Sequence, residues 1–233
     1  MQETSASADA EPSQTLADAL ARRGISLDEP VVDKLDAYCR TLWGWNEKIN
    51  LTRHTTYDKF AARDVVDSLR IAAVLAQGER VLDLGTGAGV PGVVLAIARP
   101  DLRVTLSESV GKKARAVSDM VAALGLKVAM NHGRGEELLA RRKFDTVVVR
   151  AVAPLTKLLT WFKPHWNSLG RMLIVKGPQW VEERGEARHL GLFNTLELRK
   201  RDAWIMEGTE SESVLLEIWP KSREPRLAGV DGG

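Results

Sequence analysis

The sequence has little of what disulfide-bonded, metal-dependent or membrane proteins need. Among 233 residues there is one cysteine, so a disulfide or a cysteine-based zinc site cannot form within one chain. Cys39 falls at the apolar spacing of an expected helix, which predicts a buried core thiol. No stretch approaches the length of a membrane span, and residues 1–15 carry neither a basic start nor an apolar run. We therefore expect a cytoplasmic, reducing location away from the membrane.

Histidines are also few. The sequence has four, His54, His132, His165 and His189, and they are scattered along the chain. We expect each to be a surface or hydrogen-bonded side chain rather than a catalyst or a metal ligand, so no metal is expected. The net charge of only +2 permits an anionic partner without requiring one. We expect the protein to act as a monomer.

The most informative stretch that is present runs from Val81 to Gly92 and reads VLDLGTGAGVPG. Its apolar start suits a buried parallel strand, and its glycines allow tight backbone paths and close approach to a ligand. Pro91 suits the first turn of a helix, where a missing N–H costs nothing. A strand, a loop and a helix in this order open a doubly wound nucleotide-binding fold, whose ligand lies at the carboxyl end of the strand.

Two cofactors compete for this loop. Residues 87–92 satisfy G-x-G-x-x-G, which is typical of NAD-binding proteins, but the glycine that directly follows the strand is Gly85, and the third position in its register is Val90. Asp83, immediately before the glycines, resembles instead the D/E-x-G-x-G-x-G motif of class I S-adenosylmethionine (SAM) methyltransferases. We expect its carboxylate to serve the methionine ammonium group, with a loop cap as the alternative. The expected cofactor contacts here are Asp83, Gly85, Thr86, Gly87, Gly89 and Val90.

The chain after this loop alternates short β-rich runs with amphipathic segments, as a parallel sheet with right-handed crossovers requires. Strands are expected at residues 80–84, 103–107, 127–131, 144–149 and 172–176, and helices at 91–99, 112–124, 136–142, 154–169 and 179–189. Two further strand-like runs, 196–201 and 214–219, predict an antiparallel terminal hairpin. The expected fold is α/β and Rossmann-like, with a mostly parallel seven-stranded sheet as in class I SAM methyltransferases.

Helical periodicity also precedes the glycine loop. Helices expected near residues 16–24, 31–49 and 57–75 form an N-terminal cap of the kind that shapes a pocket over an open sheet. The predicted organisation is a disordered lead-in at 1–14, a helical cap at 15–77, a SAM-binding core at 78–220 and a flexible tail at 221–233.

Further cofactor candidates lie at the ends of the following strands. Glu108 ends the second strand about twenty residues past the glycines, where a carboxylate binds ribose hydroxyls in NAD and SAM proteins alike. Gly135 and Glu136 open a helix after the third strand, where a backbone N–H and a carboxylate can hold an adenine. Arg150 closes the fourth strand, the position nearest to a transferable methyl group.

Cations gather at the same predicted rim. Arg134, Arg150 and Lys176 end or follow neighbouring strands, and Lys112 with Lys113 opens the helix after the second strand. A large anionic substrate such as RNA would account for such a cluster. The alternative is that each cation pairs with a neighbouring acid.

Several motifs keep a specific order and spacing from about Val31 to Trp219. They are Asn46 with Asn50-Leu51-Thr52, Asp67-Ser68-Leu69, VLDLGTGAGVPG, Glu108-Ser109 with Lys112-Lys113, Arg134-x-Glu136-Glu137, Arg150-Ala151-Val152-Ala153 and Lys176-Gly177. In this order they resemble the RsmG (GidB) family. The resemblance implies SAM-dependent methylation of guanosine N7 in bacterial 16S ribosomal RNA, free or in the small ribosomal subunit. It implies cofactor contacts at Gly85, Val90, Gly135 with Glu136, and Arg150; one departure is Asp64, where the family commonly has a histidine.

The chemistry implied by this resemblance matches the missing acid–base pair. Guanine N7 carries a free lone pair on the major-groove edge, so its methylation needs no general base and depends mostly on positioning. We expect Arg150 to help form the methyl-transfer pocket, and Arg134, Lys176, Lys112 and Lys113 to contact RNA. Two other functions stay open: an NAD-dependent oxidoreductase, motivated by residues 87–92 and Glu108, and a non-catalytic RNA-binding or assembly factor, motivated by the cationic rim.

Overall fold

The computed structural model describes residues 11–206 and 209–223. The predicted lead-in at 1–14 and tail at 221–233 therefore lie largely outside the described residues. At their described margins the chain makes defined contacts. The backbone N–H and hydroxyl of Ser13 both donate to the carboxylate of Asp58, each at 2.8 Å, and the guanidinium of Arg223 donates to Asn167 Oδ1 at 3.1 Å.

The predicted sheet is confirmed. Seven strands pair in the order β3-β2-β1-β4-β5-β7-β6, with parallel pairing from β3 to β5 and antiparallel pairing of β7 with both β5 and β6. The strands are β1 (Arg80–Leu84), β2 (Arg103–Glu108), β3 (Ala129–His132), β4 (Phe144–Arg150), β5 (Leu169–Lys176), β6 (Leu196–Ile205) and β7 (Glu212–Pro220). Because β1 to β5 are parallel, their carboxyl ends meet at one edge of the sheet.

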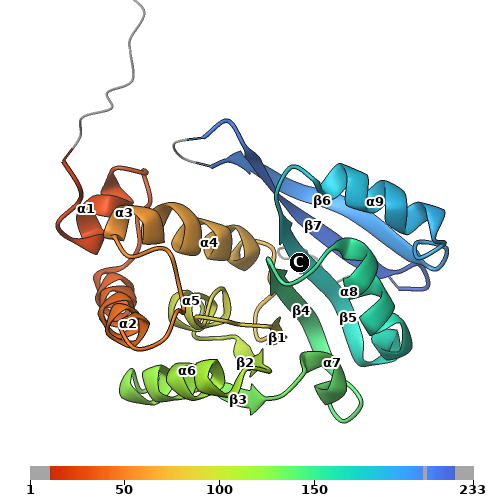
Figure 1. Cartoon of the computed structure of the whole chain (residues 1–233), viewed down its shortest axis with the longest axis horizontal. Coiled ribbons are helices and arrows are strands. Elements are labelled where there is room, and N and C mark those ends of the chain that lie inside the picture. The colour runs from red at the N-terminus through yellow and green to blue at the C-terminus, as the bar shows by residue number, and fades with distance from the viewer. Residues whose placement is uncertain (1–10, 207–208, 224–233) are drawn as a thin grey trace, which may run out of the picture.

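Helices cover both faces of the sheet (Figure 1). One layer holds α1 (Leu16–Ala21), α2 (Glu29–Asn46), α3 (Tyr57–Lys59), α4 (Val66–Ala72), α5 (Gly92–Ala98) and α6 (Gly111–Ala123), and the other holds α7 (Gly135–Leu138), α8 (Leu155–Phe162) and α9 (Trp180–His189). Successive strand residues alternate between the two cores: Val148 packs with the first layer, whereas Val147 and Val149 pack with the second. Cys39 is fully buried in the first core, as predicted. None of the helices within the described ranges is long and apolar enough to cross a membrane.

Two predicted helices are interrupted. The helix expected at 57–75 consists of α3, a π-helical segment at Phe60–Val65 and α4. The helix expected at 154–169 is α8 followed by a 3₁₀ helix at Lys163–Ser168. Pro164 explains the second break, because proline lacks the N–H that would continue an α-helix. The π-helical segment inserts a wider turn, which is a common feature of functional sites.

A buried ion cluster ties three strands to the chain before β1. Arg171 on β5 donates from Nη1 to Glu217 of β7 and from Nη2 to Glu79, each at 2.8 Å, and from Nε to the hydroxyl of Thr146 at 2.9 Å. Its side chain is 2% exposed, and those of Glu79 and Glu217 are 5% and 0% exposed. Each charge is thus removed from water and compensated by its partners.

Replacing Arg171 with methionine should destabilise the protein strongly. The change leaves the buried carboxylate of Glu79 without its ion-pair partner and leaves Glu217 with Arg201 alone, 3.6 Å from its Oε2, which costs about 3–5 kcal/mol. Urea denaturation measures the loss of unfolding free energy. Arg80→Met is the matched control, because the Arg80–Asp145 pair is about half exposed and its removal should cost less than about 1 kcal/mol. Equal losses for the two variants would contradict a structural role for the buried cluster.

Candidate functional site

The glycine loop at the end of β1 is built around the buried carboxylate of Asp83. Asp83 Oδ2 accepts hydrogen bonds from the hydroxyl of Thr86 and from the backbone N–H of Gly92, the latter at 2.9 Å. Burial raises the pKa of Asp83 to about 6, although these two hydrogen bonds oppose the shift. The other oxygen, Oδ1, is buried and has no hydrogen-bond partner among the described residues. Asp83 therefore holds the loop in shape and keeps unused acceptor capacity, so it fulfils the loop-cap alternative.

Two glycines of this loop are required by close packing. Gly85 has φ +65°, and a Cβ atom there would lie 2.9 Å from Cγ2 of Val152. A Cβ at Gly92 would overlap the side chain of Leu106 and lie 2.7 Å from Asp83 Oδ2. Gly92 therefore lets the start of α5 approach the sheet, a role that the third glycine plays in dinucleotide-binding folds.

A first cavity, of about 490 Å³, opens at the carboxyl ends of β1, β2 and β3. Its walls include three of the predicted cofactor residues, Gly85, Gly135 and Glu136. The remaining lining residues are Leu84, Ser107, Ser109, Gly133, Arg134, Val152 and Trp161. The hydroxyl of Ser107 donates to the carbonyl of Gly133 at 2.8 Å and so links β2 to the loop after β3. The cavity lies where an open α/β sheet binds its ligands.

Glu108 connects two of the loops at this edge. Its Oε2 accepts from the backbone N–H of Gly87 at 3.0 Å, and its Oε1 accepts from that of Val110 at 2.8 Å. A carboxylate offers about four lone-pair positions, so each oxygen can still accept a hydroxyl. Neither Glu108 nor Asp83 lines the first cavity, but the residues next to them in the sequence, Ser107, Ser109 and Leu84, do. The spare acceptor positions of Glu108 and of Asp83 Oδ1 at this edge, with the volume of the cavity, fit an adenosine-containing cofactor with a cationic tail.

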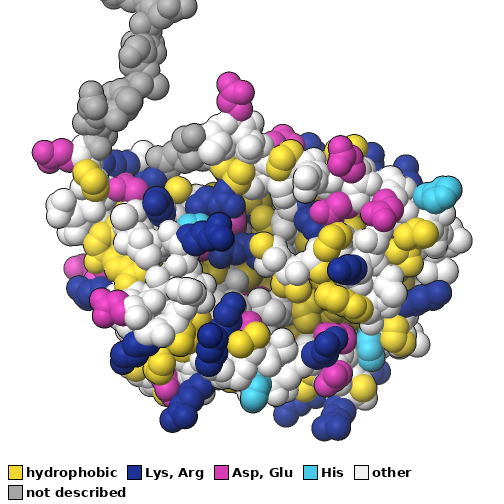
Figure 2. Space-filling model, viewed as in Figure 1, with side chains coloured by type: hydrophobic (Ala, Val, Ile, Leu, Met, Phe, Trp, Pro, Cys, Tyr) yellow, Lys and Arg dark blue, Asp and Glu magenta, His cyan; other side chains and the backbone are white. Residues whose placement is uncertain are grey.

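A second cavity, of about 400 Å³, opens at the ends of β4 and β5. It is lined by Arg63, Asp67, Arg150, Ala151, Val175, Lys176, Gly177, Pro178, Gln179, Glu183, Met206 and Ser213. Ala151 lines this cavity, whereas the next residue, Val152, lines the first one. The loop from β4 to α8 is therefore a wall common to both cavities. Ala151 has φ +55°, and a left-handed non-glycine residue is a conformation often stored at functional sites. Figure 2 shows Lys and Arg side chains gathered around the hollow near the centre of this face.

Arg150 joins this wall to the N-terminal helices. Its Nη2 lies 2.7 Å from Asp64 Oδ1, and its Nη1 lies 3.3 Å from Asp67 Oδ2. Burial lowers the pKa of Arg150, but the two carboxylates outweigh burial and raise it. Burial likewise raises the pKa of Asp67, against the opposing charge of Arg150. Asp64 also contacts His54 Nδ1 at 2.9 Å, so His54 is a hydrogen-bonded side chain, as predicted.

The structure corrects the expectation of a cluster of free cations in one crevice. Arg150 is paired with two carboxylates, and Lys176 Nζ lies 2.6 Å from Glu183 and donates to the carbonyl of Ala153 at 2.8 Å. Only 10% of the Lys176 side chain is exposed, so it holds the β4–α8 loop instead of facing solvent. Arg134 lines the other cavity and lies 3.6 Å from Glu136, with most of its side chain exposed. The pairing alternative therefore describes all three.

Several other predicted cofactor residues lie behind the cavities. Val90 is packed in the hydrophobic core, and Thr86 is buried with its hydroxyl on Asp83. A Cβ at Gly89 would meet the hydroxyl of Tyr38 on α2, so Gly89 faces the helical layer. Of the predicted RNA contacts, Lys112 and Lys113 lie in the first turn of α6 near the rim.

Sequence reasoning missed several residues that line the two cavities. They are Arg63, Trp161, Met206 and Ser213. Val152 and Asp67 belong to motifs of the resemblance, but spacing alone predicts neither the place of Val152 in the cavity wall nor the pairing of Asp67 with Arg150. The motif Asn50-Leu51-Thr52 has a structural explanation, since Asn46 Oδ1 accepts from the backbone of Leu51 and Thr52 and holds the loop that carries His54.

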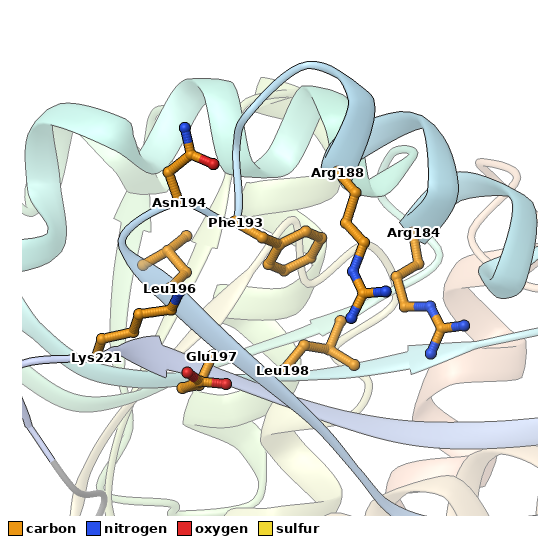
Figure 3. A pocket seen from close by; sticks show the side chains of 8 residues that line it. All are labelled: Arg184, Arg188, Phe193, Asn194, Leu196, Glu197, Leu198 and Lys221. Atoms are coloured by element: carbon orange, nitrogen blue, oxygen red, sulfur yellow. The ribbon is translucent and has the colours of Figure 1, made fainter.

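A further groove, of about 280 Å³, lies between α9 and the start of β6 (Figure 3). Arg184 and Arg188 extend from α9 beside Phe193, and Lys221 lies across the groove. Leu196, where β6 begins, pairs with Pro220, so the groove lies near the amino ends of the parallel strands. The glycine loop is at the opposite edge, and the groove is therefore separate from the candidate site.

The raised pKa of Asp83 predicts a pH-dependent contribution to stability. Because the folded state favours the protonated form, this contribution is present below about pH 4 and is lost as the pH rises through about 6. Asp83→Asn keeps an acceptor for Gly92 without the charge. Between about pH 4 and pH 7, the unfolding free energy of the wild type should fall by roughly 2–3 kcal/mol relative to this variant. Urea denaturation across this range measures the difference, and a constant difference would rule out the assignment.

Comparisons with solved structures identify the fold. TrmK of M. capricolum, solved with S-adenosyl-homocysteine, superposes with a TM-score of 0.53 at 12% identity, covering 71% of each chain. A precorrin-6y C5,15-methyltransferase from Geobacter metallireducens superposes with a TM-score of 0.51 at 12% identity, covering 76% of this chain and 95% of the other. At such identities the likeness shows the class I methyltransferase fold alone.

Sequence comparisons are more specific. The ribosomal RNA small subunit methyltransferase G of Rhodopirellula baltica is 51% identical over 181 residues, and that of Chlorobium luteolum is 41% identical over 186 residues, each alignment covering 78% of both chains. The family model GidB, described as rRNA small subunit methyltransferase G, matches residues 31–201. The chain therefore belongs to the rRNA small subunit methyltransferase G family.

Proposed function

We propose that this protein transfers the methyl group of SAM to N7 of a guanosine in small-subunit ribosomal RNA. The observation that carries the proposal is the pair of adjoining cavities at the carboxyl edge of the sheet, with residues 151–152 as their common wall. One cavity suits the cofactor and the other suits a base. The methyltransferase family to which the chain belongs supports the cofactor, the reaction and the RNA substrate.

The first cavity is the proposed cofactor site. Gly85, Gly135 and Glu136 in its wall would contact SAM, and Glu108 would accept the ribose hydroxyls. Asp83 would favour the cationic methionine end through its buried charge. When bound, SAM supplies an electrophilic methyl group on a sulfonium sulfur. The other predicted loop residues shape the backbone behind this cavity.

The chain's own contribution is positioning. Guanine N7 has an unprotonated lone pair, so no group of the protein needs to remove a proton from it. Arg150, through Asp64 and Asp67, holds the second cavity against the N-terminal helices. Lys176 and Glu183 hold the common wall through Ala153 and Leu155. Such rigid placement, with water excluded, is the main source of rate enhancement available to this site.

RNA contact is assigned to the cations that keep exposed side chains at the rim. Arg134 and Lys112 are exposed, and Lys113, the neighbour of Lys112 in the sequence, is half-buried. Their attraction for phosphate would be sequence-independent and sensitive to salt.

Family membership does not favour the NAD-dependent oxidoreductase. A cytoplasmic location and a monomeric state stay predictions.

Label transfer tests the proposed reaction. The purified protein is incubated with methyl-labelled SAM and either naked small-subunit rRNA or assembled small subunits, both from cells lacking the enzyme. We expect label at N7 of one guanosine in at least one of these substrates. Absence of label at any guanine N7 would overturn the proposal, and tight binding of NAD without binding of SAM would favour the oxidoreductase.

Gly85→Ala should weaken SAM binding by about tenfold or more, equivalent to about 1.4 kcal/mol. Its new methyl group would press on Val152, the side chain that lines the cofactor cavity. Gly24→Ala is the matched control, because Gly24 has nearly the same φ, +64°, and open space around its Cβ. Calorimetric titration with SAM measures both variants. If they lose affinity equally, backbone strain and not the cavity explains the effect.

A further inference from the structure

We propose that the second cavity is the binding pocket of the target base, and that the carboxylate of Asp67 selects guanine by accepting hydrogen bonds from its N1–H and its N2 amino group. This inference rests on the proposed function and deepens it. It assigns a substrate pocket and a specificity-determining residue to a part of the molecule for which the glycine loop gives no information.

The first support is an unmet hydrogen-bonding capacity in the cavity wall. Asp67 lines the cavity, and its side chain is only 1% exposed. Its Oδ2 faces Arg150, but its Oδ1 is buried without a hydrogen-bond partner among the described residues. A buried carboxylate oxygen without a donor is costly, so such an atom beside a cavity indicates a ligand that supplies the donor.

The second support is the contrast with the neighbouring carboxylate. Asp64 is 2% exposed and also pairs with Arg150, but its two oxygens contact His54 and Arg150. Asp64 is not among the residues that line the cavity. Of these two acids beside Arg150, only Asp67 both lines the cavity and has a carboxylate oxygen without a hydrogen-bond partner among the described residues.

Guanine is the base whose chemistry matches this acceptor. Its N1–H and N2 amino group are adjacent donors on the Watson–Crick edge, and an ionised carboxylate only accepts. Adenine places an acceptor at N1, which a carboxylate would repel. Enzymes that act on an extruded base commonly read this edge. Since N7 lies on the opposite, major-groove edge of guanine, binding through Asp67 leaves the N7 lone pair free to react.

The arrangement around Asp67 would hold the carboxylate in place during recognition. Arg150 Nη1 contacts Oδ2 at 3.3 Å, and Arg150 Nη1 also lies 3.5 Å from the backbone carbonyl of Arg63. Oδ2 retains a second lone pair, so each oxygen of Asp67 has the capacity to accept one of the two donors of guanine. The apolar side chains of Val175 and Met206 also line the cavity and offer surfaces against which a base could pack.

Substitution of the target nucleotide tests the proposal with the wild-type enzyme. Small-subunit rRNA is assembled by ligation with guanosine, inosine or 1-methylguanosine at the methylated position. Inosine lacks only the N2 amino group, 1-methylguanosine lacks the N1–H, and both keep N7. We expect kcat/KM to fall by roughly 10- to 100-fold for inosine, the effect of one lost hydrogen bond to a charged group, and further for 1-methylguanosine.

Two variants assign the effect to Asp67. Asp67→Asn should lose a similar factor on guanosine and should treat guanosine and inosine almost alike. Asp64→Asn removes the same charge beside Arg150, and we expect it to keep the wild-type ratio of guanosine to inosine. Calorimetric SAM binding, which uses the other cavity, checks that each variant is folded. If Asp67→Asn fails to fold, the wild-type ratios for the two analogues decide.

The outcomes separate this inference from the proposed function. If the wild type methylates no guanosine, the proposed function itself fails. If it methylates guanosine, inosine and 1-methylguanosine at similar rates, the reaction stands and the pocket assignment is wrong. Retention of the wild-type preference by folded Asp67→Asn would likewise overturn the role of Asp67.

Discussion

The candidate site depends on the guanidinium of Arg150, which is held between the carboxylates of Asp64 and Asp67. This contact joins the end of β4 to the N-terminal helices, two parts of the chain that are far apart in the sequence. Removing a charge from water is tolerated only when partners compensate it, so the position of each group constrains the other two. One guanidinium does not supply a donor to every oxygen of two carboxylates. Asp67 Oδ1 is the oxygen that is left without a hydrogen-bond partner among the described residues.

A second buried carboxylate, Asp83, has the same constructive role in the glycine loop. Its oxygen takes the hydroxyl of Thr86 and the N–H of Gly92, so the loop closes around the acid. Much of the glycine motif therefore serves backbone geometry and the packing of α5 on the sheet. Only part of it, with Gly85 foremost, reaches the cavity wall. A cofactor motif of this kind predicts at which edge of the sheet the cofactor binds more reliably than it predicts which atoms contact the cofactor.

The order of strands and helices could be predicted because hydrophobic periodicity directly reflects burial on one or two faces. The π-helical segment at Phe60–Val65 could not, since its residues look like those of a regular helix. The pairing of charges could not be predicted from the sequence either. Lys176 pairs with Glu183, and Arg150 with Asp67, only because the fold brings their elements together. Spacing predicted which strand ends share an edge, whereas the partner of each charge depends on side-chain placement across that edge.

The neutralised cations change how recognition of RNA must work at this site. With Arg150 and Lys176 engaged by carboxylates, long-range attraction depends on exposed side chains such as Arg134 and Lys112, which carry no sequence information. Asp64 strengthens this effect, because it contacts both Arg150 and His54. Two of the three cations that line the second cavity, Arg150 and Lys176, are thus paired with carboxylates, and the wall offers the acceptor of Asp67 beside the half-buried Arg63. Selection of a base in such a pocket follows from donors on the base edge, and the phosphates serve to bring the RNA to the rim.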